Sequence, residues 1–370
     1  MATVAVIFGG PSPEHDVSIL TGLQACRTLL DDGRAVTALY WSKAGSWHQV
    51  PPDLEAPAFA GGVPDQARAA HLVLGPEGGF VLDRRGLGSP RRLDCDVAVI
   101  CCHGGPGEDG TLQGALDLCG IRYTGPSAAA AGLGMDKLAF GGVVAAAGLP
   151  TLPRVLLAAE QDGELPFGGP YLVKPRFGGS SIGIEIVEDL PTARALVASS
   201  VHMRRGAVVE PFLERAFDIN VALRTWPQPQ LSAIERPTKT STSTRILSYA
   251  EKYVGAEGMT SAPRELPATL PDQVERQVVA AARRLATVAA VRGVARLDFL
   301  CDGESVYVNE INTIPGSLAK YLWIKPMVSF LELLQDMIDE AMARETFVTT
   351  TQGADGSVLR SAASIAAKLA

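Results

Sequence analysis

Two neighbouring apolar segments near the end of the chain carry side chains that could hold a metal ion together with a nucleotide. Asp298 lies in the first segment, and Glu310 and Asn312 lie in the second. Oxygen-bearing side chains with few histidines or cysteines nearby suit Mg²⁺ that bridges substrate phosphates better than they suit zinc. Because side chains alternate along a strand, Arg296 shares a face with Asp298, and Glu310 shares a face with Asn312. The pattern therefore predicts a magnesium site for a nucleotide.

The elements that must position this site are predicted to be the two buried strands of a hairpin. Residues 293–299 and 308–312 are apolar runs, with turn-forming residues between them and Pro315 and Gly316 after them. Four polar side chains that face one another inside apolar strands would be costly unless they held something charged. The alternative is a set of buried Arg–Asp and Glu–Asn pairs that only ties the hairpin together.

A loop of glycine and serine after another predicted strand could wrap phosphate. The strand at 171–174 ends in Lys174, and the loop that follows contains Ser180 and Ser181. Backbone N–H groups and hydroxyls in such a loop can bind phosphate oxygens while the lysine supplies a charge. The loop is not a Walker A motif, because no Gly-Lys-Ser/Thr sequence opens a helix. The alternative is a glycine-rich hairpin with a surface lysine.

Two further places carry weaker signals for nucleotide binding. Lys137 precedes a helical run and, taken alone, would be an ordinary exposed residue. Glu210 follows the strand at 207–209, where an acid and exposed main chain could form a hinge that recognises the edge of an adenine. A strand end with solvated acids is the alternative there. Residues 249–253 have a loop composition, with two tyrosines, a glutamate and a lysine, and loops often carry function.

Near the start of the chain, Glu14 and His103 follow or flank predicted strands. Asp16 or Ser18 could be no more than the N-cap of the first helix, whereas Glu14 lies just outside it and is free to meet a ligand ammonium. His103 follows a buried strand, a position at which a lone histidine is often structural. Its glycine-rich surroundings favour access by a ligand.

The order of elements predicts an α/β fold. Residues 3–8 form a β-branched strand that leads into a glycine turn and a helix, and buried strands recur at 35–41 and 96–101. In an open parallel sheet, ligands bind at the carboxyl ends of the strands, so the loops after residues 8 and 102 are expected to share one site.

Composition limits the classes of partner. The chain has 370 residues, is 47% hydrophobic and has a net charge of -7, without a dense basic stretch that would bind nucleic acid. No apolar run approaches the roughly 18 residues of a membrane span, and the start lacks the basic region of a signal peptide. We therefore expect a cytoplasmic protein with a small ligand and without a membrane or nucleic-acid partner. The six cysteines show no CxxC spacing, so disulfides and zinc are not expected.

Taken together, these motifs resemble the D-alanine:D-alanine ligase family of ATP-grasp enzymes. The resemblance spans about residues 3 to 345 and rests on the order and spacing of the motifs at 8–18, 103–114, 135–137, 174–183, 249–253 and 293–316. It implies an ATP-grasp fold, in which an open parallel-sheet domain precedes two α+β subdomains that clamp ATP. The expected parts are a substrate-binding domain, a lid subdomain, a catalytic subdomain and a peripheral tail, at 1–125, 126–206, 207–346 and 347–370.

The resemblance also implies a role for each candidate residue. The ATP contacts are expected from Lys137, Lys174, Ser180, Ser181, Glu210, Phe212, Leu213, Asp218 and Lys252. Two Mg²⁺ ions, with Mn²⁺ as an alternative, are expected on Asp298, Glu310 and Asn312. The oxyanion of the tetrahedral intermediate is expected to meet Arg296 and the N–H of Gly316. The ammonium of the first amino acid is expected on Glu14, with its carboxylate near His103. A contact among Tyr253, Ser180 and Glu14 is expected to lock two loops over the site.

The implied reaction joins two D-alanines in peptidoglycan precursor synthesis. ATP phosphorylates a carboxylate to an acyl phosphate, which the amine of the second substrate then attacks, so no side-chain nucleophile is required. Positioning and exclusion of water are the expected work of the enzyme. The family also implies a homodimer.

The acceptor end departs from the family pattern. Relatives usually have a Met/Phe-Thr pair and a serine that binds the second carboxylate, where this chain has residues 317–323, Ser-Leu-Ala-Lys-Tyr-Leu-Trp. Ser317 or Lys320 could replace that contact. Alternatively, the acceptor is D-serine, D-lactate or a specialised metabolite, although Tyr253 favours an amine over a hydroxy acid. The lid has Phe177 and Gly178 where an Arg-Glu pair is common.

Two readings from other classes are less well supported. A nicotinamide oxidoreductase is suggested by the opening strand and glycines, but the full GxGxxG fingerprint is absent. A relative that binds nucleotide or peptide without catalysis is the other possibility. The joint presence of the two lysines, Lys137 and Lys174, with Arg296, Asp298, Glu310 and Asn312 argues against it.

Overall fold

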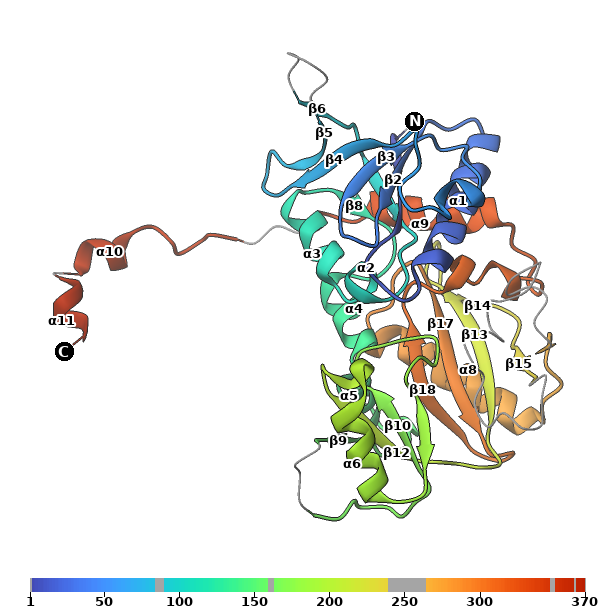
Figure 1. The fold of residues 1–370 in the computed structure, drawn as a ribbon. Helices are drawn as coiled ribbons and strands as arrows, with labels where there is room; N and C mark the ends of the chain where they lie inside the picture. The colour runs from blue at the N-terminus through green and yellow to red at the C-terminus, as the bar shows by residue number, and fades with distance from the viewer. Residues whose placement is uncertain are drawn as a thin grey trace.

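Among the described residues, three β-sheets of four or more strands, formed by successive stretches of the chain, provide the framework of the protein (Figure 1), and a fourth sheet has two strands. The N-terminal sheet lies at one end, and the two other sheets lie side by side at the opposite end. The computed structural model describes residues 2–83, 90–158, 163–238, 264–346, 350–362 and 364–369.

The N-terminal sheet is mixed. Its parallel half has the order β2-β1-β7-β8 and consists of β2 (Val36–Trp41), β1 (Val4–Gly9), β7 (Val97–Ile100) and β8 (Arg122–Tyr123). The predicted parallel sheet is therefore present, and antiparallel strands extend it beyond β2. They are β3 (Trp47–Val50), β4 (Arg68–Val73), β5 (Gly79–Leu82) and β6 (Arg91–Arg92). Every residue of β1 is buried, as expected of a central parallel strand that is covered on both faces.

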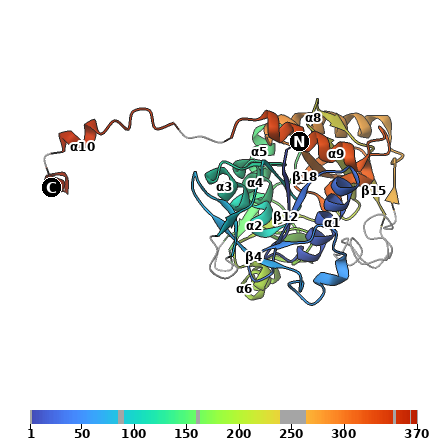
Figure 2. The ribbon, with the colours of Figure 1, turned by 90° about the horizontal axis from the view of Figure 1, so that it is seen from above.

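Helices from both ends of the chain cover this sheet. The N-terminal ones are α1 (His15–Asp31), η1 (Ala56–Phe59), α2 (Gly105–Glu108) and α3 (Thr111–Leu118). Helix α9 (Phe330–Ala343) returns from the C-terminal part and packs its apolar face into the same core (Figure 2). Glu14 is the N-cap residue of α1, so neither Asp16 nor Ser18 caps it.

The central sheet is antiparallel, with the order β11-β10-β12-β9. Its strands are β11 (Glu185–Val187), β10 (Tyr171–Pro175), β12 (Ala207–Pro211) and β9 (Val155–Leu157), with α6 (Leu190–Ser199) and η2 (Val201–Met203) beside them. The expected boundary at 206/207 would assign β12 to the next subdomain. The strand instead pairs with both β10 and β9, because its wholly apolar start completes the core of the central sheet.

The third sheet has the order β14-β13-β17-β18 and contains the predicted hairpin. Its strands are β14 (Gln230–Leu231), β13 (Phe217–Arg224), β17 (Val294–Cys301) and β18 (Val306–Asn312). The amphipathic helix α8 (Asp272–Val288) and the linking helix α5 (Lys137–Ala146) bury one face of it. Helix α4 (Ala128–Met135) precedes α5, η4 (Gly316–Leu322) follows β18, and β15 (Arg236–Pro237) pairs with β16 (Arg264–Glu265).

The C-terminal tail carries α10 (Ser357–Ser361) and α11 (Ile365–Leu369), which lie away from the three sheets in Figures 1 and 2. In the described ranges, every helix is too short or too polar to span a bilayer.

Candidate active site

The two expected metal-binding strands bring their polar side chains together. Asp298 and Glu310 are paired across β17 and β18, and so are Arg296 and Asn312. Nε and Nη2 of Arg296 each donate a hydrogen bond of 2.7 Å to the carboxylate of Asp298. The side-chain amide of Asn312 donates to the same carboxylate at 2.9 Å. Arg296 and Asp298 are buried. The buried Arg–Asp pair that was expected if the polar residues only tie the hairpin together is therefore present. It lies on the same face of the hairpin as Glu310.

The donor set fits a magnesium ion that arrives with phosphate. Asp298 and Glu310 supply carboxylates from directly opposed positions, and Asn312 supplies an amide. Over the described part of the chain, no three His, Cys, Asp or Glu side chains are close enough to hold a metal by themselves. Mg²⁺ commonly uses one or two carboxylates together with substrate phosphates and water, rather than a complete protein cage.

A β-bulge at Asn309 shapes this part of the hairpin. The register jumps from Asp298 opposite Glu310 to Phe299 opposite Val308, so Asn309 is the extra residue. Its side-chain oxygen accepts a hydrogen bond from Lys174 Nζ at 3.2 Å, and its main-chain carbonyl accepts one from Arg154. Bulges often occur beside active sites, where they redirect side chains.

Both candidate phosphate lysines are buried, which excludes the alternative in which they are ordinary surface residues. Lys174 has 4% of its surface exposed and Lys137 has 7%. The ammonium of Lys137 lies 3.7 Å from Glu310 and donates to the carbonyl of Gly178 in the glycine-rich loop. Burial lowers the pKa of Lys137; Glu310 counteracts this, and the nearby Lys174 adds to it. Two buried ammonium groups therefore lie beside the proposed metal-binding carboxylates, where they could bind the oxygens of a polyphosphate.

Glu210 is also fully buried, contrary to the alternative of a solvated strand end. Its two carboxylate oxygens accept from Lys174 Nζ at 2.8 Å and from Arg154 Nε at 2.7 Å. Burial opposes ionisation of Glu210, but the two cations outweigh it and keep its pKa below the ordinary value. Arg154 is therefore part of this cluster, although nothing in the sequence singled it out.

The remaining nucleotide candidates lie on β13 and in the connection that leads to it from β12. The N–H of Phe212 donates to the carbonyl of Pro170, and Leu213 follows in the same connection to β13. Asp218 lies two residues before Asn220 on β13, and Asn220 is directly opposite Asp298. Because positions two apart share a face, Asp218 lies on the face of the sheet that carries Asp298.

The glycine-rich loop reaches across to the N-terminal domain. The hydroxyl of Ser180 donates to the carboxylate of Glu14, which is itself buried. Ser180 and Ser181 adopt left-handed φ angles of 52° and 59°. A Cβ atom on Gly104 or Gly179 would lie only 2.5 or 2.8 Å from Glu14 Oε2, so both glycines allow the backbone to approach this carboxylate closely. Lys252 and Tyr253 lie outside the described residues.

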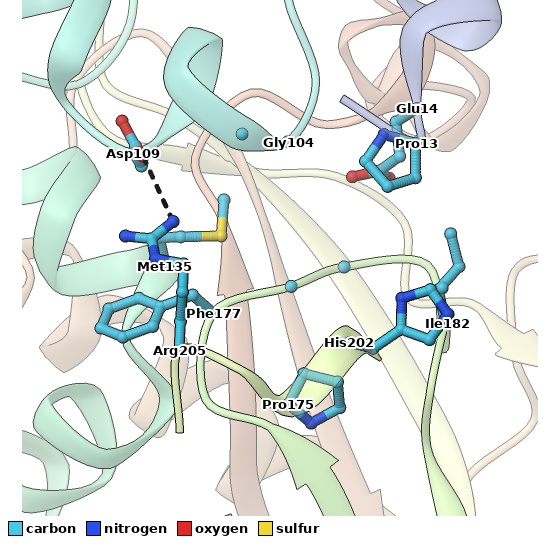
Figure 3. A pocket seen from close by; sticks show the side chains of 13 residues that line it. Pro13, Glu14, Gly104, Asp109, Met135, Pro175, Phe177, Ile182, His202 and Arg205 are labelled. Carbon is cyan, nitrogen blue, oxygen red and sulfur yellow. Dashed lines mark ion pairs between the residues drawn. The ribbon is translucent and has the colours of Figure 1, made fainter. Parts of the chain in front are cut away.

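A cavity of about 190 Å³ separates the glycine-rich loop from the N-terminal domain, as Figure 3 shows. Glu14 borders it on one side, and Met135 and Phe177 provide apolar walls. An ion pair between Arg205 and Asp109, at 3.9 Å, crosses from the central subdomain to the N-terminal domain beside it. Glu14 is thus accessible from a space between the two domains.

His103 lies at this junction with both ring nitrogens engaged. Nδ1 is 2.7 Å from the carbonyl of Ile314, Nε2 is 2.8 Å from the hydroxyl of Thr21, and that hydroxyl accepts from the N–H of Ser317 at 3.0 Å. Burial lowers the pKa of His103 to about 4, so the imidazole is neutral near pH 7. If His103 bound a substrate carboxylate, as expected, its ring would have to give up the hydrogen bond to Ile314 or the one to Thr21. The geometry favours a structural role, in which His103 fixes the chain on both sides of Gly316.

Glu108 makes a second, parallel connection that sequence reasoning missed. Its carboxylate accepts from the N–H of Gly104 at 2.8 Å and from the N–H of Ile314 at 3.0 Å. Burial, with a smaller effect of the neighbouring Glu14, raises the pKa of Glu108 to about 7 despite these hydrogen bonds. The loop after β7 is therefore attached to the segment after β18 by two buried groups.

The predicted acceptor segment has an unusual backbone. Ser317, Leu318 and Ala319 are consecutive residues with left-handed φ angles of 48°, 49° and 52°. Such runs cost free energy and commonly occur at functional sites. The half-buried ammonium of Lys320 lies 5.1 Å from the centre of the Phe330 ring, and burial lowers its pKa. The hydroxyl of Tyr321 is buried without a hydrogen-bond partner among the described residues.

Family models match most of the chain. One described as "D-ala D-ala ligase N-terminus" matches residues 3–126, and one described as "D-ala D-ala ligase C-terminus" matches residues 143–339. A D-alanine–D-alanine ligase from a Bradyrhizobium species is 33% identical over 359 residues, which cover 92% of this chain and 95% of that protein. A D-alanine–D-alanine ligase from Mycolicibacterium gilvum is 31% identical, and the match covers 93% of this chain and 98% of that protein.

Solved structures share the fold. The D-alanine-D-alanine ligase from Coxiella burnetii has a TM-score of 0.74 at 23% identity and covers 92% of this chain and 94% of that one. The VanG D-Ala:D-Ser ligase from Enterococcus faecalis also has a TM-score of 0.74, at 22% identity, and the match covers 92% of this chain and 99% of that one. The expected ATP-grasp fold is therefore confirmed.

Proposed function

Because this chain belongs to the D-alanine–D-alanine ligase family, we propose that it is an ATP-dependent, ADP-forming ligase that joins two D-alanine molecules. The observation that carries the proposal is the convergence of two buried lysines, Lys137 and Lys174, on the carboxylate-bearing face of the β17–β18 hairpin. Such a site can neutralise a triphosphate in a place from which water is largely excluded.

The first step forms an acyl phosphate. A carboxylate oxygen of the first D-alanine attacks the γ-phosphorus of ATP, the bond from that phosphorus to the bridging oxygen breaks, and ADP leaves. Lys137 and Lys174 hold the phosphates, and Glu14 holds the ammonium of the amino acid. The contact between Ser180 and Glu14 closes the glycine-rich loop over the acyl phosphate and protects it from hydrolysis.

The second step forms the peptide bond. The amine of the second D-alanine attacks the carbonyl carbon, negative charge develops on the carbonyl oxygen, and the carbon–oxygen bond to phosphate then breaks. Arg296 and the N–H of Gly316 stabilise that charge. The proton released by the amine passes to the departing phosphate or to water. Mg²⁺ held by Asp298, Glu310 and Asn312 would supply additional neutralisation of phosphate charge when bound.

Three finer features belong to the same proposal. The metal is Mg²⁺, with Mn²⁺ as a substitute, the enzyme acts as a cytoplasmic homodimer on small amino acids, and the dipeptide serves peptidoglycan precursor synthesis. The domain limits are proposed to lie at 125/126 and 346/347, and the domains on either side of 125/126 are proposed to move relative to each other when the site closes.

A second candidate keeps the same chemistry with another acceptor. It is supported by segment 317–323, which departs from the expected family pattern and has a left-handed backbone from Ser317 to Ala319. An altered acceptor pocket could take D-serine, D-lactate or a larger amine.

The test is phosphate release from ATP and Mg²⁺ with a panel of single amino acids and pairs of both stereochemistries, with products identified by mass. D-Alanine alone should give release and D-alanyl-D-alanine. Turnover only with another pair would reject D-alanine as the acceptor and support the second candidate.

A further inference from the structure

Arg154 connects three segments that carry the proposed nucleotide site. Its Nε donates to Glu210 on β12 at 2.7 Å, its Nη1 donates to the carbonyl of Lys137 at the start of α5 at 3.0 Å, and its Nη2 donates to the carbonyl of Asn309 on β18. The side chain has only 4% of its surface exposed. One guanidinium thus joins the central sheet, a linking helix and the third sheet.

The surroundings are shaped to hold this side chain. A Cβ atom on Gly141 of α5 would lie 2.7 Å from Arg154 Cδ, so the glycine leaves the space that the side chain fills. The bulge at Asn309 leaves a carbonyl outside the regular register with β17, and Arg154 binds that carbonyl.

Each group that Arg154 binds is linked to a predicted phosphate contact. Glu210 and the side chain of Asn309 are the two acceptors for Lys174 Nζ, at 2.8 and 3.2 Å. The third acceptor is the main chain of Lys137, whose ammonium lies beside Glu310. The cluster has three cations and two carboxylates, which leaves one positive charge in excess for an anionic ligand.

We propose that Arg154 is a positioning residue that sets both phosphate-binding lysines for ATP. The proposal rests on the nucleotide site proposed above and goes beyond the residues assigned to it. All the hydrogen bonds described for Arg154 go to protein groups, so its effect on a ligand passes through the lysines. It fixes the acceptors of Lys174 and the backbone of Lys137, so that both ammonium groups are in place before ATP binds.

Only arginine can make this connection. A guanidinium presents several N–H donors in a rigid plane and can bind three acceptors on different segments, whereas a lysine ammonium is a single point charge on a flexible stem. Arg154→Lys keeps the charge beside Glu210 but is expected to lose at least one of the two carbonyl contacts. The charge and the positioning can therefore be separated by experiment.

The experiment measures Arg154→Lys and Arg154→Met with two readouts. The first is the affinity for a non-hydrolysable ATP analogue with Mg²⁺ by calorimetry, without any amino acid. The second is the KM for ATP and for the amino acid in the phosphate-release assay. Both variants should weaken the analogue and raise the KM for ATP by about 10- to 100-fold, with the amino-acid KM changed less than about twofold. Gly141→Ala should shift the same quantities in the same direction.

Two controls separate positioning from general loss of structure. Arg284→Met removes an arginine that also donates to a backbone carbonyl, that of Ala147, but outside the cluster, and should leave both readouts unchanged. If Arg154→Met does not fold, Arg154→Lys and Gly141→Ala, which both leave a positive charge beside Glu210, carry the test.

Unchanged affinity and KM for ATP in Arg154→Lys and Gly141→Ala would overturn the proposal, as would equal increases in the two KM values. If the wild-type protein fails to bind the analogue, the nucleotide site and the proposal fall together. If it binds the analogue but does not turn over D-alanine, only the substrate assignment fails, and the affinities still decide the role of Arg154.

Discussion

The buried carboxylate of Glu108 predicts that the N-terminal domain loses stability as pH rises. Glu108 holds the N–H groups of Gly104 and Ile314 from a buried position, and burial raises its pKa from 4.5 to about 7. Below pH 4.5, the group is protonated in both folded and unfolded protein. Between 4.5 and 7, the unfolded chain ionises while the folded protein keeps its proton, so this contribution to stability is lost as pH rises through 7.

The size of the effect follows from the raised pKa. Each unit of difference between the folded and unfolded pKa corresponds to about 1.4 kcal/mol, so the full effect is about 3 kcal/mol, most of which is lost between pH 5 and pH 8. Glu108→Gln removes this dependence. It also places an amide N–H₂ opposite one of the two N–H donors, which should cost about 1 to 3 kcal/mol at every pH.

The assay is urea unfolding of the wild type and Glu108→Gln at several pH values, followed by the circular dichroism of the stacked Trp41–Trp47 pair. These rings are 4.6 Å apart on β2 and β3 and so report the N-terminal sheet. The free energy of unfolding of the wild type minus that of Glu108→Gln should fall by about 2 to 3 kcal/mol from pH 5 to pH 8. Glu275→Gln, on the exposed side of α8, is the control. A difference that does not change with pH would refute the reasoning.

Three further substitutions have defined expectations. Ser180→Ala removes a charge-assisted hydrogen bond to Glu14, so kcat/KM for the first amino acid should fall by about 10- to 100-fold; a change under twofold would show that this contact does not matter in the closed site. Gly104→Ala places a Cβ 2.5 Å from Glu14 Oε2 and should raise the KM for that amino acid, whereas Gly114→Ala, with no atom within 4 Å of its Cβ, should not. Equal KM values for the two variants would contradict this. Tyr321→Phe removes a buried hydroxyl without a described partner, so the Tm should stay the same or rise, and a clear fall would reveal a bond made by that hydroxyl.

The parts that could be predicted from sequence have local signals. The β17–β18 hairpin follows from two apolar runs separated by turn residues, and the alternation of side chains correctly placed Arg296 with Asp298. Three of the parallel strands of the first sheet, β1, β2 and β7, were also predictable from buried apolar runs, whereas the two-residue β8 was not. In the antiparallel extension, β3, β4 and β6 are less apolar and β5 is only four residues long, so these strands gave no comparable signal.

The parts that could not be predicted depend on contacts between distant segments. His103 and Ile314 are 211 residues apart in sequence, and Glu108 binds a similarly distant N–H, so no local pattern relates them. Arg154 sits between a proline and a short apolar strand and looks like an ordinary charged residue. The bulge at Asn309 is a single extra residue, which leaves no trace in composition.

These contacts also explain why the lysines were undervalued. A lysine is rarely buried without a partner, and the partners of Lys174 come from β12 and β18. Only the assembled fold shows that both phosphate candidates are buried cations rather than surface residues.

The most direct test of the central claim uses D-alanine labelled with ¹⁸O in its carboxylate. If the carboxylate attacks ATP and forms an acyl phosphate, one labelled oxygen must remain with the phosphate when the amine of the second D-alanine displaces it. Mass analysis should therefore find one ¹⁸O atom in each molecule of released phosphate, together with D-alanyl-D-alanine. Phosphate released without the label would show that ATP is cleaved by water and would contradict the proposed ligase reaction.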